Sequence, residues 1–367
     1  MQIGILSEPS DKRVALVPEV IEQLVQSNNK VLVESGAGTK SYISDKLFEQ
    51  AGAMVTSREE VLKSTDMLIS INQLSADSYR ALKDHAVVIS SFQPFNDKNI
   101  SKDLSSNNIT AFSMDMVPRI TLAQSMDVLS SMASIAGYQA VLEAAARLPR
   151  YFPMLTTAAG TIPPAKVLVL GAGVAGLQAI ATAKRLGGVV EAFDTRLAAK
   201  EEVESLGAKF VMVEGARDDK AAGGYAVEQT EEYQQKQQAL IQEKAIKADV
   251  IITTAQLRGK PAPTLITAET VKSMKPGAVI VDLAASTGGN CEVTRNGETI
   301  EVNNVTIIGN SDLAQEVPMH ASHFYSKNIL NFLKVLLRED GTLNLDFDNE
   351  IIKSSCIAHA GQDLFNK

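Results

Sequence analysis

The stretch Lys166-Val-Leu-Val-Leu170, continued by Gly171-Ala-Gly-Val-Ala-Gly176, decides the fold of the chain. A short apolar strand runs into a tight glycine turn, and a helix is expected after the turn. The first glycine permits the turn, the second lets the backbone approach a pyrophosphate, and the third lets helix and strand pack closely. Because N–H groups at a helix N-terminus bind phosphates, the stretch predicts a dinucleotide-binding unit.

An acidic residue closes the next apolar run. Asp194 lies 18 residues beyond Gly176, at the expected tip of the second strand and near the spacing of about 20 residues typical of a ribose-binding acid. A carboxylate there accepts hydrogen bonds from a ribose 2′-hydroxyl and repels a 2′-phosphate. We therefore expect the chain to bind NAD(H) rather than NADP(H).

Composition limits the classes of protein to which the chain can belong. Its 367 residues are 45% hydrophobic and 21% charged, which suits a globular protein of two domains. The net charge of -8 argues against binding to nucleic acid or to an anionic membrane surface. No apolar run approaches the roughly 20 residues that cross a bilayer, and no signal peptide is expected. With 2 cysteines and 4 histidines, we expect no disulfide framework, a cytoplasmic location and no metal site.

Alternating apolar runs and amphipathic stretches predict two parallel sheets, each covered by helices. Two long helices are expected between them, at about 123–148 and 317–337, so that the chain forms two doubly wound, Rossmann-like α/β domains. The expected boundaries give a first domain of residues 1–125 plus 320–367 and an NAD(H)-binding domain of residues 126–319. The expected strands are Ile3–Leu6, Lys30–Val33, Met67–Ile71, Ala86–Ser90, Thr110–Ser113, Lys166–Leu170, Val189–Phe193, Lys209–Val213, Val250–Thr254, Ala278–Asp282 and Thr306–Ile308.

A polar set lies where the chain is expected to pass between the domains. If a helix begins near Ala123, then Gln124, Asp127 and Ser130 share one edge of it, with Arg119 in the preceding loop. These side chains offer donors and acceptors suited to a carboxamide and supply no evident acid or base. The alternative is structural, with Asp127 capping a helix and Gln124 solvated.

The long polar segment Val213–Gln238 interrupts the second series of strands. Polar loops of this length are uncommon in compact domains, and this one contains Gly223, Gly224 and Tyr225. The segment is expected either to close over a bound cofactor or to be a solvated surface loop.

The motifs together resemble the NAD(H)-binding component of proton-translocating nicotinamide nucleotide transhydrogenase. The resemblance covers essentially the whole chain. It rests on the segment around Arg119, on the glycine motif, and on Thr157–Pro164, Thr253-Thr-Ala255, Gly259–Pro263, Val281–Ala285 and Gly288–Cys291. Arg119, Gln124, Asp127 and Ser130 match the family's loop that holds the dihydronicotinamide, and Gly224 and Tyr225 match its mobile loop.

The resemblance implies a split enzyme in which hydride passes directly between two nicotinamide rings. The chain would bind NAD(H), while partner chains bind NADP(H) and conduct protons through the membrane. It would be a homodimer held at the cytoplasmic face of the membrane by those partners, with NAD(P)+ transhydrogenase activity of the Si-specific or proton-translocating type. The cofactor-binding residues implied are Gly171, Gly173, Val174, Ala175, Gly176, Asp194, Thr195, Arg196, Gly224, Tyr225, Thr254, Ala255 and Leu257.

Two other functions are compatible with these residues. Alanine-type amino-acid dehydrogenases share the architecture, and Arg13 is then either a ligand of a substrate carboxylate or a structural ion pair. Against this function, the chain has Asn72 where those enzymes have lysine, no histidine in Val87–Gln93, and Ser286 near their aspartate. A non-catalytic NAD(H) sensor is the second alternative.

Overall fold

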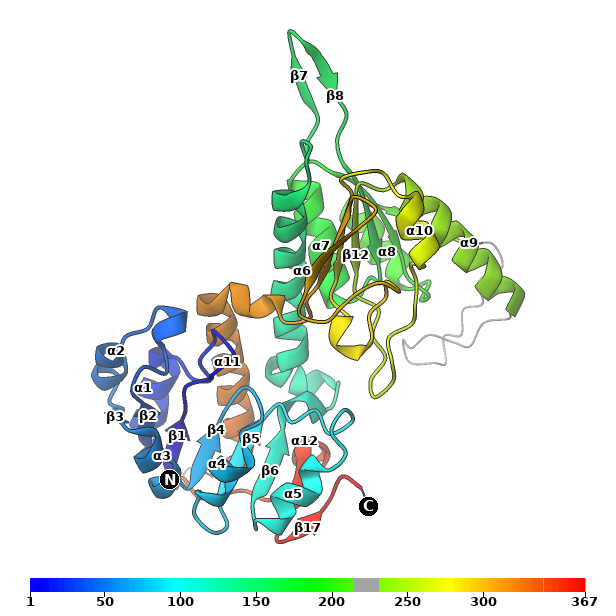
Figure 1. Ribbon diagram of the computed structural model, residues 1–367. Coiled ribbons are helices and arrows are strands. Elements are labelled where there is room, and N and C mark those ends of the chain that lie inside the picture. Colours follow the sequence, from blue (N-terminus) through cyan, green and yellow to red (C-terminus); the bar gives the residue numbers. More distant parts are fainter. Residues whose placement is uncertain (214–230, 339, 367) are drawn as a thin grey trace. The chain divides into compact units, whose positions relative to one another are not determined.

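The computed structural model describes residues 1–213, 231–338 and 340–366, which form two compact units (Figure 1). The first unit combines residues 1–132 with 315–367, and the second comprises residues 133–314. The chain therefore leaves the first unit, forms the second, and then returns to complete the first.

The first unit contains an eight-stranded sheet in the order β17-β16-β6-β5-β4-β1-β2-β3. Strands β1 to β6 are parallel, whereas β16 pairs antiparallel with β6 and β17 antiparallel with β16. The strands are β1 (Gln2–Ile5), β2 (Lys30–Glu34), β3 (Met54–Thr56), β4 (Met67–Ile69), β5 (Val87–Ser90), β6 (Thr110–Ser113), β16 (Cys356–His359) and β17 (Gln362–Asp363).

Both faces of this sheet are apolar, so helices cover both. On β2, Val31 and Val33 enter the core that includes residues of α1 and α11, and Leu32 enters the core with residues of α3 and α5. The helices are α1 (Pro18–Gln26), α2 (Asp45–Gln50), α3 (Arg58–Ser64), α4 (Ala76–Arg80), α5 (Ile100–Ser106), α11 (Pro318–Leu336) and α12 (Glu350–Ser355). Short 3₁₀ helices of this unit are η1 (Thr39–Ser41), η2 (Met114–Met116) and η3 (Thr121–Met126), while η6 (Leu313–Glu316) begins in the second unit and ends in the first.

The second unit contains a seven-stranded sheet in the order β11-β10-β9-β12-β13-β15-β14. Its parallel strands follow the order typical of dinucleotide-binding folds, with β14 added antiparallel at one edge. The strands are β9 (Lys166–Leu170), β10 (Val189–Phe193), β11 (Lys209–Phe210), β12 (Val250–Thr253), β13 (Val279–Asp282), β14 (Thr299–Val302) and β15 (Val305–Gly309).

Alternate residues of β9 enter opposite cores of the second unit. Val167 and Val169 pack with residues of α6 and α7, while Leu168 and Leu170 pack with residues of α9 and α10. Helix α6 begins in the first unit and continues into the second. The helices are α6 (Val128–Arg147), α7 (Val174–Arg185), α8 (Ala199–Ser205), α9 (Glu231–Lys247), α10 (Ala268–Ser273) and the 3₁₀ helix η5 (Ala285–Thr287).

The predicted fold class of parallel-sheet, Rossmann-like α/β units is confirmed. The expected strands are present, but the one predicted at 209–213 ends at Phe210, where β11 pairs with β10 at the edge of the sheet that the structure describes. After α6 the chain forms an exposed hairpin, β7 (Leu155–Thr157) with β8 (Gly160–Ile162). In Figure 1 this hairpin projects away from the sheet of the second unit.

A buried carboxylate joins three segments at the start of the parallel strands in the second unit. Asp249 accepts hydrogen bonds from Arg150 (2.9 Å), Lys275 (2.8 Å) and the backbone N–H of Lys166 (2.8 Å). Its side chain is 5% exposed, whereas both cations are partly exposed and therefore partly screened by water. The bond to the backbone N–H of Lys166 is the costliest to lose, because a donor fixed in the sheet cannot turn toward another acceptor.

Asp249→Ala is expected to lower the free energy of unfolding by about 2 kcal/mol, because it leaves that N–H without its acceptor. Urea unfolding followed by circular dichroism measures this loss. The control is Glu298→Ala, whose exposed pair with Arg295 spans 3.6 Å and should contribute less than about 0.5 kcal/mol. Equal losses in the two variants would contradict the assignment.

Candidate functional site

The glycine turn between β9 and α7 is closely packed at two of its glycines and open at the third. Gly171 has a φ of 98°, which favours glycine, and a Cβ on Gly176 would lie 1.9 Å from the carbonyl oxygen of Gly171. A Cβ on Gly173 would meet no protein atom within 4 Å. Packing within the protein therefore requires the first and third glycines, while the space over Gly173 suits a close-approaching ligand.

The first turn of α7 supplies donors beside that space. The first N–H groups of a helix have no acceptors within the helix, and Val174 at this end is exposed. Helix α6 supports the same turn, because a Cβ on Gly137 would lie 2.1 Å from the carbonyl oxygen of Ala175. These features fit the pyrophosphate of a dinucleotide.

Asp194 lies just after β10, and protein donors occupy its carboxylate. One oxygen accepts the N–H (2.8 Å) and Nε (2.9 Å) of Arg196, and the other accepts the N–H of Ala172 (2.8 Å) and Nη2 of Arg196 (2.9 Å). Burial alone would raise the pKa of Asp194, but the donors of Arg196 and Ala172 outweigh it and lower the pKa. Asp194 is thus a carboxylate held beside the glycine turn by the N–H of Ala172 and by Arg196.

The loop after β12 contains three further residues predicted to bind the cofactor. The hydroxyl of Thr254 donates to the carbonyl oxygen of Gly171 (3.1 Å), so its side chain supports the glycine turn. Leu257 is half exposed. The backbone of Ala255 is held by Asn290, which accepts from its N–H (3.0 Å) and donates to its carbonyl oxygen (2.8 Å).

Asn290 is itself held by a second buried acid that the sequence had not singled out as a functional residue. Asp282, at the end of β13, is fully buried and has no cationic partner among the groups that bond it. Its carboxylate accepts from the hydroxyls of Thr253 and Thr294 and from the N–H groups of Ala284, Asn290 and Cys291, over 2.7 to 3.0 Å. Asp282 and Asn290 together fix the loop after β12 next to the glycine turn. A charged residue ending an otherwise apolar strand was the available signal in the sequence.

The predicted nicotinamide-binding segment lies in the first unit, and the expected start of its helix, near Ala123, was wrong. Residues Thr121–Met126 form a 3₁₀ helix and α6 begins at Val128. The reason is the carboxylate of Asp127, which accepts from the N–H (2.9 Å) and hydroxyl (2.6 Å) of Ser130 and so caps α6. Asp127 and Ser130 are therefore in contact, as the structural alternative required, whereas Gln124 does not share a helix edge with them.

The other two residues of this segment are exposed. The side chains of Arg119 and Gln124 are solvent-accessible and make no hydrogen bond to any residue that the structure describes. Buried Ala123 and Met126 anchor the segment, and Asn328 of α11 donates to the carbonyl oxygen of Ser125 (2.8 Å). The segment is thus fixed by its backbone while two polar side chains point into solvent.

The other residues considered for binding or catalysis have structural roles or lie outside the described residues. Arg13 forms a buried ion pair with Asp11, and Asn72 donates to Glu8 (3.2 Å) and Asp11 (3.1 Å). Burial raises the pKa of the Cys291 thiol to about 11, which does not suit a nucleophile. Gly224 and Tyr225 lie outside the described residues.

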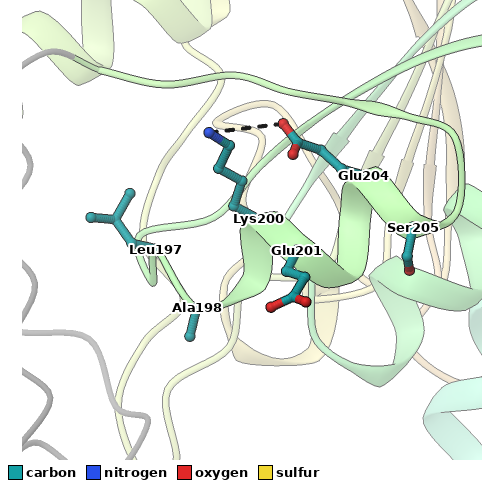
Figure 2. Close-up of a pocket in the computed structure, with 6 residues that line it drawn as sticks. All are labelled: Leu197, Ala198, Lys200, Glu201, Glu204 and Ser205. Carbon is teal, nitrogen blue, oxygen red and sulfur yellow. Dashed lines mark ion pairs between the residues drawn. The ribbon is translucent and has the colours of Figure 1, made fainter.

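An open pocket of about 520 Å³ lies along α8, directly after Arg196 (Figure 2). Its lining is Leu197, Ala198, Lys200, Glu201, Glu204 and Ser205, and Lys200 pairs with Glu204 at 4.0 Å. None of these residues was predicted to bind the cofactor. Across the described ranges, neither a cluster of three or more metal-ligating side chains nor a helix able to cross a membrane is found.

The chain is similar to known proteins over nearly its whole length. Family profiles described as Alanine dehydrogenase/PNT, N-terminal domain and C-terminal domain match residues 4–136 and 140–366. In Rhodospirillum rubrum, the protein named as the first part of NAD(P) transhydrogenase subunit alpha is 43% identical over 372 residues, covering 98% of this chain and 97% of that protein.

Two solved structures superpose on the chain. The transhydrogenase of Sinorhizobium meliloti has a TM-score of 0.91 and 43% identity, covering 99% of this chain and 100% of that one. An L-alanine dehydrogenase has a TM-score of 0.82 and 24% identity, covering 99% and 96%, which demonstrates a shared fold.

Asn290→Ala is expected to speed hydrogen exchange at the Ala255 amide by about tenfold or more, because that N–H loses its acceptor. Exchange measured by mass spectrometry on peptides spanning residues 250–265 reports this change. Asn310→Ala serves as the matched control, since the Asn310 side chain accepts locally from the N–H of Asp312 (2.8 Å). Unchanged exchange in Asn290→Ala would remove Asn290 from its supporting role.

Proposed function

Because the chain belongs to the alanine dehydrogenase/PNT family and is by homology a transhydrogenase alpha subunit, we propose that it binds NAD(H) for direct hydride transfer to NADP+ on a partner chain. The observation that carries this proposal is the glycine turn of the second unit, in a chain 43% identical to a transhydrogenase alpha subunit from end to end. The open space over Gly173 and the bonded position of Asp194 support NAD(H) as the ligand.

The second unit would bind the nucleotide part of the cofactor. In this proposal the N–H groups of the first turn of α7 hold the pyrophosphate, and Asp194 accepts from the ribose hydroxyls. Thr195, Arg196, Ala255 and Leu257 lie on the loops after β10 and β12, at the carboxyl ends of the strands where such ligands bind. Thr254 has a different role in this proposal, because its hydroxyl donates to the carbonyl oxygen of Gly171 and so supports the glycine turn.

The first unit would orient the nicotinamide. Arg119 and Gln124, whose side chains are exposed, are proposed to bind the carboxamide, while Asp127 and Ser130 hold the start of α6. NADH, when bound, supplies the hydride. Transfer between two C4 carbons moves no proton at the reacting centre, so positioning is the main contribution that the protein must make.

The remaining components are proposed from the family. One partner would bind NADP(H) and another would span the membrane and conduct protons. The chain would be a homodimer, held by these partners at the cytoplasmic face of the membrane. The name of the Rhodospirillum rubrum relative describes one portion of one subunit, which supports a complex of several chains.

An amino-acid dehydrogenase is the second candidate, because the L-alanine dehydrogenase fold is shared. The side chain of Arg13 is only 9% exposed and its guanidinium is already paired with Asp11, which opposes binding of a substrate carboxylate. Asn72 contributes no positive charge and is bonded to two acids. These contacts favour the transhydrogenase component. A non-catalytic NAD(H) sensor would bind NADH and transfer no hydride.

Reconstitution with NADP(H)-binding and membrane partners is expected to give NADH-dependent reduction of an NADP+ analogue. Arg119→Ala and Gln124→Ala should each lower the hydride-transfer rate about tenfold or more while changing the Kd for NADH less than about threefold, because they act at the ring. Stopped-flow absorbance measures the rate.

The matched control is Gln50→Ala, an exposed glutamine of the first unit that should transfer hydride at the wild-type rate. Alanine with NAD+ tests the dehydrogenase alternative. Wild-type rates in both Arg119→Ala and Gln124→Ala would contradict their role, and binding without any transfer would favour the sensor.

Asp194→Ala is expected to raise the Kd for NADH about tenfold or more, because a hydrogen bond to a charged acceptor contributes about 1.5–3 kcal/mol. Fluorescence titration with NADH measures the change. Glu201→Ala, which removes an exposed acid of α8, is the charge control and should leave the Kd unchanged. Equal Kd values for Asp194→Ala and wild type would exclude Asp194 from the binding site.

A further inference from the structure

The carboxylate of Asp194 has no acceptor position left for a ribose. An ionised carboxylate offers about four lone-pair sites, and here each oxygen accepts two protein donors within 2.8 to 2.9 Å. Two of the four donors are backbone N–H groups, fixed by the turns of Ala172 and Arg196. The other two are Nε and Nη2 of the Arg196 side chain, which can rotate away.

We propose that in the free protein the Arg196 side chain occupies the acceptor positions of Asp194 that a ribose needs, and that a ribose diol displaces this side chain when the cofactor binds. A diol needs two acceptor positions, and the guanidinium occupies two, one on each oxygen. This inference rests on the proposed binding of NAD(H). It makes Arg196 a residue that determines specificity between NADH and NADPH.

The surroundings of Arg196 allow it to move. Its side chain is 36% exposed, whereas that of Asp194 is 8% exposed, so water reaches the guanidinium and barely reaches the acid. Glu202, on the first turn of α8, is a second carboxylate close enough to act on Arg196, although Asp194 contributes most to its raised pKa. Glu202 is therefore a second anion for a displaced guanidinium, and the lining of the pocket along α8 begins at the next residue in the chain, Leu197 (Figure 2).

Displacement leaves a guanidinium next to the acid that binds the ribose. In the wild type the negative charge of Asp194 still repels a 2′-phosphate. Once the acid is removed, the same guanidinium is free to pair with that phosphate, since arginine binds phosphate with two parallel bonds. Asp194 thus selects the 2′-hydroxyl of NADH, and Arg196 is available to bind the 2′-phosphate of NADPH.

The test is a double-mutant cycle of Asp194→Ala, Arg196→Gln and their combination, with Kd values for NADH and for NADPH. Arg196→Gln is expected to bind NADH about threefold or more tightly, because the charged, forked guanidinium is replaced by a shorter, neutral amide that competes less for Asp194. Asp194→Ala should bind NADPH about tenfold more tightly than wild type, and the double variant should lose that gain.

Arg185→Gln, at the C-terminal end of α7, controls for the loss of one positive charge and should change neither Kd. Circular dichroism verifies folding, and Arg196→Lys, which keeps the charge but loses the fork, replaces Arg196→Gln if that variant fails to fold. Unchanged or weaker NADH binding in Arg196→Gln overturns the proposal that a ribose diol displaces Arg196 from Asp194. A double variant that binds NADPH as tightly as Asp194→Ala does overturns the placement of the guanidinium beside the 2′ position of the ribose. A wild-type chain that binds no NADH instead overturns the proposed function.

Discussion

The contact between the carbonyl oxygen of Gly171 and the α-carbon of Gly176 constrains the whole second unit. A single added methyl group would lie 1.9 Å from that oxygen, so β9 and α7 can pack as they do only with glycine at this position. The contact sets where α7 begins and thus where its N–H groups point. Thr254, Ala172 and Gly137 all touch the same turn, which ties β12, Asp194 and α6 to one point.

Two buried acids around this turn have different environments and different consequences. Asp282 is fully buried, and the donors that the structure describes around its carboxylate are hydroxyl and N–H groups, an arrangement that fixes loops in place. Asp194 is bonded by a partly exposed guanidinium as well as by backbone, so part of its coordination can be exchanged. The bonds of Asp282 therefore fix the loops that support the site, whereas two of the bonds of Asp194 can be exchanged for bonds to a ligand.

The sequence predicted the sheets and the glycine turn because these depend on short-range patterns. Alternating apolar runs located the strands, and the resemblance to transhydrogenase is confirmed by the family match. The start of α6 was misplaced because the apolar pattern begins at Ala123, while the capping bond of Asp127 begins the helix at Val128. Asn290 was missed as a support because its partner, Ala255, is far away in sequence, and the pattern around it reads only as a glycine turn.

The pairing of β16 with β6 has a consequence for the order in which the chain folds during synthesis. Residues 133–314 are contiguous and can fold as soon as they leave the ribosome. The first sheet lacks β16, and the core around it lacks α11, until residues 318–359 have also emerged. Residues 1–132 thus precede the second unit along the chain but belong to the unit that is completed later, and in the interval the edge of β6 that pairs with β16 is open to pairing with another strand.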